Sequence, residues 1–199
     1  MSWPVLAVAV VGAVVFGGSV AGALLPEIHP LEQRVFRAVN GLPGWLYWPL
    51  WGPMQLGNLV VGTVAGLLAA LAWGDWLMAI GVILAMVLKL VSERVVRHRM
   101  AEHLQVRQRP GTSEPGAILR GDDVPASGPS FPSGHVILVA AIACLVVTDI
   151  PIAWAWVPHL LVVMVMFGRV YVGAHNPLDV TAGLGVGLLV GSVLDLLLR

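Results

Sequence analysis

The stretch Pro132 to His135 reads PSGH and stands where a charged segment gives way to a run of apolar residues. If the apolar run is a helix, the hydroxyl of Ser133 and the backbone N–H groups of Gly134 and His135 lie at its N-terminus. That end of a helix carries partial positive charge and unpaired N–H groups, so it favours an anion. A phosphoryl group is the anion that we expect there.

The stretch GRVYVGAHNPLDV near the C-terminus brings an arginine, a histidine and a carboxylate together. Asn176 and Pro177 suit the cap and the first residue of a helix, which places Asp179 one turn after His175. A carboxylate on one ring nitrogen fixes the histidine tautomer and makes the other nitrogen a better nucleophile. We therefore expect His175 to be an activated nucleophile, with Arg169 as an anion-binding partner.

A third stretch, VRQRPG, holds Arg107 and Arg109 two residues apart before a proline. A guanidinium group presents a planar fork of N–H donors that matches the oxygens of a phosphate. His135, which stands on a different apolar run from His175, would be free to give a proton to a leaving alkoxide. Together the three stretches predict a phosphate pocket between two histidines with different roles.

The elements that must position these residues are membrane helices. Hydrophobic residues make up 58% and charged residues 11% of the 199-residue chain, which is far more apolar material than a soluble domain of this length needs. No Gly or Pro interrupts residues 82–109, so the third helix should continue past the membrane. We predict an all-α bundle in one domain, residues 1–199, with six apolar spans at about 4–25, 56–73, 76–91, 135–150, 152–172 and 178–198. The third and fourth spans are short, which predicts a recessed site where they end.

Charge is concentrated on one side of this predicted bundle. The segment 92–134 holds half of all the Lys, Arg, Asp and Glu residues of the chain. With six spans, the loops after spans one, three and five share a side opposite both termini, and all three motif stretches lie on it. Between spans one and two, a helix lying in the membrane interface is predicted by apolar residues at helical spacing, with arginines opposite: Leu31, Val35, Phe36 and Val39.

The motif set resembles the type 2 phosphatidic acid phosphatase superfamily of membrane lipid phosphatases, which are relatives of the vanadium haloperoxidases. The signature of that family is K-x6-R-P, then P-S-G-H, then S-R-x5-H-x3-D. The second motif matches in full at residues 132–135. The third matches at Arg169, His175 and Asp179, with Gly168 where the family usually has serine.

The first motif matches only at its end, where Arg109 precedes a proline. The residue seven positions earlier is Glu102, and the only lysine of the chain, Lys89, stands eight positions before Arg97. Either Lys89 with Arg97 supplies the first motif, or Arg109 acts with another cation, Arg107 or Arg97. We favour Arg109, because its following proline and its distance from PSGH resemble the family pattern.

The resemblance implies an enzyme, namely a phosphohydrolase that needs neither a metal ion nor another cofactor. By this analogy His175 attacks phosphorus to form a phosphohistidine, Asp179 orients it, and His135 protonates the leaving oxygen and then activates water. The phosphoryl oxygens would be held by Arg109, Ser133, Gly134 and Arg169, with Lys89 and Arg97 as further candidates. The substrate would be a phosphatidate, a phosphatidylglycerophosphate, or a polyprenyl phosphate or diphosphate.

Two other functions are compatible with the same sequence. A haloperoxidase-like enzyme would hold vanadate in the phosphate pocket, although six spans suit a lipid substrate better. A lipid-binding or scramblase-like module with weak catalysis is compatible with the departure at Glu102. The formal net charge of zero gives no reason to expect nucleic acid as a partner. We expect the partners to be membrane lipids and the lipid phosphate.

The expected location is a bacterial plasma membrane, and two arguments about orientation oppose each other. Bacterial relatives commonly act on the extracytoplasmic face. Here, however, nearly all Lys and Arg lie on the side of the three motifs, with only Arg199 opposite. When Arg109 and Arg169 are set aside for chemistry, arginines of the interfacial helix and of the end of the third helix still remain on that side, namely Arg34, Arg37, Arg94, Arg97 and Arg99. The positive-inside rule then predicts a cytoplasmic site.

Overall fold

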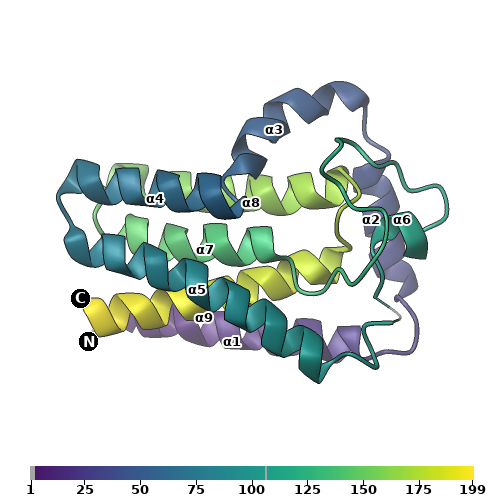
Figure 1. The fold of residues 1–199 in the computed structure, drawn as a ribbon, viewed down its shortest axis with the longest axis horizontal. Helices are drawn as coiled ribbons and strands as arrows, with labels where there is room; N and C mark the ends of the chain where they lie inside the picture. Colours follow the sequence, from purple (N-terminus) through teal and green to yellow (C-terminus); the bar gives the residue numbers. More distant parts are fainter. Residues whose placement is uncertain (1–2, 106) are drawn as a thin grey trace.

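The computed structural model describes residues 3–105 and 107–199, and within these residues the chain is helical, without a β-strand. The α-helices are α1 (Trp3–Ala23), α2 (Pro30–Asn40), α3 (Tyr47–Gln55), α4 (Leu59–Trp73), α5 (Trp76–Arg99), α6 (Pro110–Ser113), α7 (Gly134–Val147), α8 (Trp156–Tyr171) and α9 (Pro177–Leu198). Short 3-10 helices, η1 (Gly44–Leu46) and η2 (Ile152–Trp154), precede α3 and α8. Figure 1 shows the longest helices side by side, with both termini at one end of the bundle and α2, α6 and the loops at the other.

Each of the six predicted apolar segments forms a helix. Among the described residues, four helical segments are long and apolar enough to cross a membrane: Pro4–Ala23, Trp76–Arg99, Ile152–Tyr171 and Pro177–Leu198. A fifth arises if Gly44–Gln55 and Leu59–Trp73, which are bent by 60°, form one broken span. The apolar helix α7 has 14 residues, about 21 Å at 1.5 Å per residue, and is shorter than a hydrocarbon core of about 30 Å. The chain is thus a helical integral membrane protein with one short core helix.

The turn between α4 and α5 follows from its local sequence. Gly74 adopts a left-handed conformation with φ of 67°, which suits a residue without a Cβ atom at the end of a helix. Asp75 then caps α5 by accepting from the backbone N–H groups of Leu77 and Met78. Helix α5 continues to Arg99, well past the predicted end of its span at residue 91. The helix therefore runs past residue 91 but ends ten residues before Arg109, the end of the stretch without Gly or Pro.

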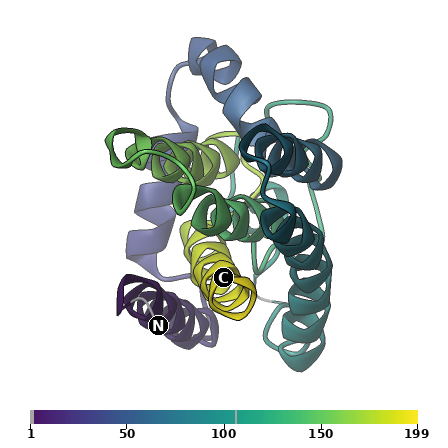
Figure 2. The same ribbon diagram turned by 90° about the vertical axis from the view of Figure 1, so that its left-hand side faces the viewer.

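Helix α9 lies inside the bundle, where it packs against α1, α5 and α7 (Figure 2). Three of its glycines, Gly183, Gly187 and Gly191, face α7. A Cβ atom on them would lie 2.5 to 2.7 Å from backbone carbonyl oxygens of Ser133, Ile137 and Ala141. Gly185 faces α1 instead, where a Cβ atom would lie 2.8 Å from the carbonyl oxygen of Gly12. The glycines thus let three helix backbones approach closely, as in other membrane bundles.

Helix α2 buries one row of residues and leaves two of its apolar side chains exposed. Phe36 is buried in the core beside Val136, but Leu31 is 61% exposed and Val35 is 43% exposed. The buried positions of α2 are Glu32, Phe36 and Asn40, which are spaced by four residues. Two polar side chains therefore point inward, and Glu32 has a role at the site described below.

The fit of α9 against α7 gives a prediction on stability. In Gly187→Ala the new Cβ atom would meet the carbonyl oxygen of Ile137 and the Cβ atom of Ala140, both at 2.6 Å. Because neither atom belongs to a flexible side-chain end, we expect a loss of about 1–3 kcal/mol in the free energy of unfolding. Gly18→Ala on α1 is the control, since nothing lies within 4 Å of its Cβ position. Thermal unfolding in detergent should show a lower melting temperature for Gly187→Ala alone.

Candidate active site

The PSGH stretch forms the start of α7, as predicted. Ser133 is the N-cap residue and Gly134 the first residue of the helix. The Ser133 hydroxyl is buried and has no hydrogen-bond partner among the described residues. Buried hydroxyl groups are nearly always paired, and the start of a helix is where an anion would be favoured, so this hydroxyl has the chemistry that an anion site needs. The backbone N–H of Ser133 donates to the carbonyl of Asp179 at 2.9 Å, which joins this stretch to α9.

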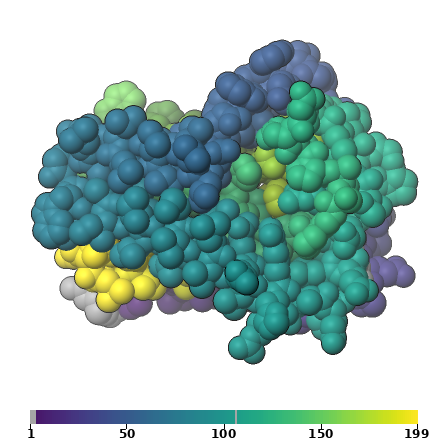
Figure 3. Space-filling model, in the orientation of Figure 1, coloured from purple at the N-terminus to yellow at the C-terminus, as the bar shows by residue number. Residues whose placement is uncertain are grey.

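His135 lies between the α3–α4 connection and α8. The ring packs against Gly57, where a Cβ atom would lie 2.9 Å from the His135 Cδ2 atom. His135 and Arg169 line one small pocket, whose other walls come from α3, from Asn58 and from the loop that carries Arg120 and Asp123. The Nε atom of Arg169 is buried there without a hydrogen-bond partner in the described chain. Figure 3 shows a hollow beside α3 with atoms of the C-terminal third, coloured olive to yellow, at its base.

His175 stands in the turn between α8 and α9 and is only 3% exposed. Its Nδ1 atom is 3.8 Å from Asp179 Oδ2, which is within ion-pair range but too long for a hydrogen bond. Asp179 Oδ2 accepts from the backbone N–H of Asn176 at 2.8 Å instead. His175 and Asp179 therefore lie close together across one turn, but without a direct hydrogen bond between them.

Electrostatics keep His175 neutral. Burial lowers the pKa of His175 to about 4, and the nearby charges of Arg169 and Arg109 add to this effect, while Asp179 opposes it. The positive charge of Arg169 also acts on His135, which lines a pocket with it. The two histidines and Arg169 thus share one electrostatic environment. A neutral imidazole is the form that can attack an electrophile.

Arg109 reaches this environment from an extended segment. The backbone N–H of Arg109 donates to Gly128 at 3.0 Å, and Ser130 donates to the carbonyl of Arg107 at 3.2 Å. This pairing ties residues 107–109 to the segment just before PSGH. Arg109 Nη1 donates to the carbonyl of Ala174 at 2.9 Å, directly before His175. Burial, followed by the charge of Arg97, lowers the pKa of Arg109, although Asp179 opposes the shift.

Lys89 comes to the same place from α5. Its ammonium group forms an ion pair with Glu93 at 2.9 Å, and a Cβ atom on Gly134 would lie 2.7 Å from the Lys89 Cε atom. The chain's single lysine therefore lies beside the first residue of α7. Arg97 stands one turn later, is more exposed, and contacts Glu93 at 3.5 Å. Both alternatives for the first motif, Lys89 with Arg97 and Arg109, lie around the start of α7.

Arg107 is placed differently from Arg109, whose guanidinium group bonds the carbonyl before His175. Its guanidinium group is buried between two carboxylates, Glu32 of α2 and Asp179 of α9. Sequence reasoning identified Arg107 only as a possible phosphate ligand and did not identify Glu32. The only sequence signal for Glu32 is that it is acidic in a helix whose other charged residues are basic. Nothing in the sequence pairs Glu32 with Arg107, which stands 75 positions later.

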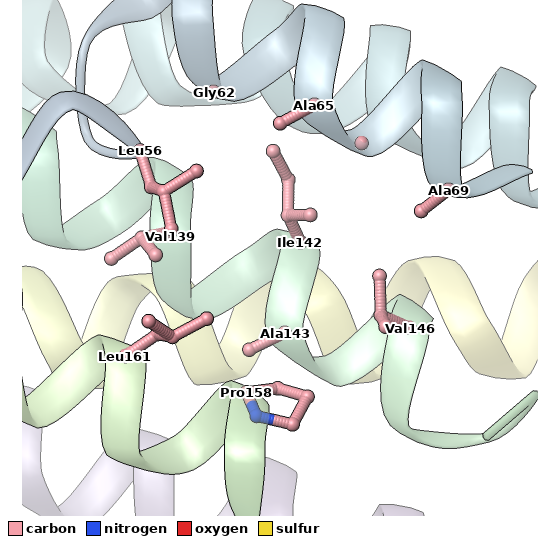
Figure 4. A pocket seen from close by; sticks show the side chains of 11 residues that line it. Leu56, Gly62, Ala65, Ala69, Val139, Ile142, Ala143, Val146, Pro158 and Leu161 are labelled. Carbon is pink, nitrogen blue, oxygen red and sulfur yellow. The ribbon is translucent and has the colours of Figure 1, made fainter. Parts of the chain in front are cut away.

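An apolar groove lies between α4, α7 and α8 (Figure 4). It encloses about 140 Å³, and small residues of α4, including Ala65 and Ala69, face into it. Leu56, at one end of the lining, directly precedes Gly57, which contacts His135. The groove therefore begins next to the polar pocket. Within residues 3–105 and 107–199, no cluster of three His, Cys, Asp or Glu side chains is placed to bind a metal ion.

Comparison with known proteins defines the class. The model of the PAP2 superfamily matches residues 76–197. The chain is 30% identical over 147 residues, 72% of its own length and 73% of the relative's, to a decaprenylphosphoryl-5-phosphoribose phosphatase of Mycobacterium tuberculosis. It is 44% identical over 55 residues to an undecaprenyl-diphosphatase of Sulfolobus acidocaldarius, a match that spans 27% of this chain and 26% of that protein. The chain belongs to the PAP2 superfamily and is a phosphoric ester hydrolase.

Two crystal structures share its fold. LpxE of Aquifex aeolicus matches with a TM-score of 0.67 and 22% identity, over 86% of this chain and 98% of that one. A PAP2-type phosphatidylglycerolphosphate phosphatase from Bacillus subtilis matches with a TM-score of 0.68 and 22% identity, over 95% of this chain and 94% of that one. At this level of identity the likeness establishes the fold of the bundle.

The low proton affinity of His175 predicts how stability depends on pH. Its pKa is about 4 in the folded chain and near 6.5 when unfolded, so the unfolded state binds the proton more tightly. Neutral His175 therefore contributes to the free energy of unfolding in full above pH 6.5, and this contribution is lost as the pH falls through 4. The loss amounts to at most about 3 kcal/mol. Melting temperatures in detergent should fall more steeply between pH 7 and pH 4 for the native protein than for His175→Asn. Parallel curves would contradict the shift.

Proposed function

We propose that the protein hydrolyses a lipid phosphate monoester or diphosphate without a metal ion, through a phosphohistidine intermediate. The observation that carries this proposal is the free, buried hydroxyl of Ser133 at the start of α7, with Lys89 and Arg109 around the same helix start. His135 and His175, on separate elements, both lie within reach of the positive charge of Arg169. Such a pocket suits a tetrahedral anion between two imidazoles.

The proposed reaction has two displacements. In the first, the free ring nitrogen of His175 attacks phosphorus, the bond between phosphorus and the lipid oxygen breaks, and His135 gives a proton to the leaving oxygen. In the second, His135 takes a proton from water, whose oxygen attacks phosphorus and displaces His175 as inorganic phosphate forms. Asp179 orients His175 and balances the charge that its ring gains.

Cations and donors hold the phosphoryl oxygens in this proposal. Arg109 and Arg169 supply guanidinium groups, and Ser133 and Gly134 supply a hydroxyl and a backbone N–H at a helix N-terminus. Lys89 takes the place of the first-motif lysine, because it lies beside Gly134 although its spacing from Arg109 departs from the family pattern. Arg97, one turn farther along α5, is the outer member of this group.

The proposed membrane arrangement keeps six spans, with α3 and α4 as one broken span, α7 as a short one, and α2 in the interface. Its support is the row of exposed tryptophans before α4, Trp45, Trp48 and Trp51, since tryptophan prefers the membrane surface. These residues lie on η1 and α3, beside the pocket that contains His135. We place the protein in a bacterial plasma membrane with the site on the cytoplasmic side, by the positive-inside rule.

We also propose that the hydrocarbon chain of the substrate lies in the groove between α4, α7 and α8. The groove is apolar and is lined by residues of apolar helices of the bundle. One end of its lining is Leu56, next to the contact of Gly57 with His135. The substrate class is a phosphatidate, a phosphatidylglycerophosphate or a polyprenyl phosphate or diphosphate. The two curated relatives, by name phosphatases of undecaprenyl and decaprenyl compounds, support the polyprenyl class.

The catalytic assignment is tested by phosphate release from these lipids in detergent with EDTA present. His175→Ala should lower kcat by about 1,000-fold or more, because it removes the attacking nitrogen. His98→Ala is the control, since this histidine is exposed on α5. Unchanged turnover in His175→Ala would falsify the assignment, and bromide oxidation in the presence of vanadate would favour a haloperoxidase instead.

The chain-binding groove is tested by narrowing it. Ala65→Phe places a ring in the groove and should raise KM for a long-chain lipid phosphate several-fold. A short-chain, water-soluble phosphate ester should be turned over as before, because the pocket around His135 is unchanged. Leu68→Phe, on the same helix but 60% exposed, is the matched control. Equal effects on both substrates would show that the groove does not hold the chain.

A further inference from the structure

We infer that Glu32 of α2 is a positioning residue of the active site, which acts on His175 through Arg107 and Asp179. This inference rests on the proposed function, in which Asp179 orients and balances the attacking histidine. Glu32 is 7%, Arg107 2% and Asp179 0% exposed. Three charged side chains from three separate segments therefore meet in the interior of the protein.

The contacts between them are mutually consistent. Arg107 Nη2 donates to Glu32 Oε1 at 2.6 Å and Arg107 Nη1 donates to Glu32 Oε2 at 3.2 Å, which makes a two-pronged pair. On its other edge, Arg107 donates from Nε at 3.2 Å and from Nη2 at 3.1 Å to one atom, Asp179 Oδ1. The guanidinium group thus fixes Asp179 through a single oxygen and leaves the Oδ2 atom toward His175.

Glu32 also holds the helix on which Asp179 stands. Its Oε1 atom accepts from the backbone N–H of Leu178 at 2.9 Å, in the first turn of α9. Because the first N–H groups of a helix lack partners within the helix, a carboxylate there stabilises its start. Glu32 therefore sets both the position of the α9 N-terminus and the position of the guanidinium group that grips Asp179.

The balance of charge gives Glu32 a second effect. With Arg107 and Asp179 alone, the cluster would be neutral, whereas Glu32 gives the three groups a net charge of −1. Burial opposes the charge of Arg107, but Asp179 and Glu32 outweigh it and raise the pKa of Arg107, so the guanidinium stays charged. His175 is faced by Asp179 and by the positive charges of Arg169 and Arg109, and it lies near His135. The surplus negative charge offsets these cations when the His175 ring becomes positive during attack.

A buried ion network can also be purely structural, and the two roles differ in what they change. A structural role affects only the amount of folded protein and its melting temperature. A positioning role lowers kcat in the folded protein with KM nearly unchanged, and it changes the proton affinity of His175. Without the charge of Glu32 the surroundings of His175 become more positive, so its pKa should fall further.

The test compares Glu32→Gln with Glu27→Gln, which removes the same charge from an exposed position in the same segment. We expect Glu32→Gln to lower kcat for a polyprenyl phosphate about tenfold, as loss of an outer partner does at metal-ligating histidines. Glu27→Gln should match the native protein. The His175 ring, followed by NMR in histidine-labelled protein, should titrate at lower pH in Glu32→Gln. Native kcat and an unshifted titration in folded Glu32→Gln would overturn the inference.

Two further variants keep the test decisive. If Glu32→Gln does not fold, Glu32→Asp replaces it in the comparison. The aspartate keeps the charge but shortens the reach to Arg107 and Leu178, so kcat should fall by less than the tenfold expected for Glu32→Gln. A native kcat in folded Glu32→Asp would count against the positioning role. Asp179→Asn separates this inference from the proposed function. An active Asp179→Asn would contradict both the proposed role of Asp179 and the inferred role of Glu32. An inactive Asp179→Asn together with a fully active Glu32→Gln would contradict the role of Glu32 alone.

Discussion

The backbone N–H of Ser133 donates to the carbonyl of Asp179, and this one bond joins the first turns of α7 and α9. It is possible because α9 presents Gly183 to Ser133, where any side chain would separate the two helices. As a result, two helix N-termini begin side by side, and their partial positive charges point to the same place. PSGH and the histidine turn, more than 40 positions apart in the sequence, become neighbours through this contact. Around this contact, α5 supplies Lys89, the segment before PSGH supplies Arg109, and α3 supplies part of the pocket wall.

The charges around this contact fall into two groups with different surroundings. Lys89, Glu93 and Arg97 follow one another along α5 and remain partly exposed, so water weakens their pairing. Glu32, Arg107 and Asp179 are buried, and each makes more than one hydrogen bond. The outer group can rearrange when an anion arrives, whereas the inner group keeps its geometry. In the proposed function, this division would let the outer group adapt to a lipid headgroup while the inner group keeps the attacking histidine in place.

The motifs and caps could be predicted from the sequence because their information is local. PSGH specifies an N-cap, Asn176 and Pro177 specify a helix start, and Asp179 stands one turn after His175 in any helix. The family likeness read from these motifs, the helical membrane bundle and the phosphatase class are confirmed. The count of six spans, the interfacial helix and the roles of individual site residues remain predictions.

What the sequence could not supply depends on contacts between distant segments. The inward positions of Glu32 and Asn40 on α2 could not be read from its apolar pattern, because both side chains are buried through polar partners on other elements. The place of Lys89 could not be read from spacing, since it depends on which face of α5 meets α7. For the same reason the sequence could not predict that Arg107, two residues before Arg109, is buried between Glu32 and Asp179.

The shortness of α7 has a consequence for how the protein meets its surroundings. A helix of 14 residues cannot reach both surfaces of a bilayer, so its His135 end lies below the level of the lipid headgroups when its other end is at the opposite surface. For a lipid headgroup to reach the His135 end of α7, the lipid would then have to move deeper into the bilayer, or the bilayer would have to become thinner locally. If the proposed function holds, turnover would then depend on the mole fraction of the lipid within the bilayer and on the thickness of that bilayer, rather than on the bulk concentration in water.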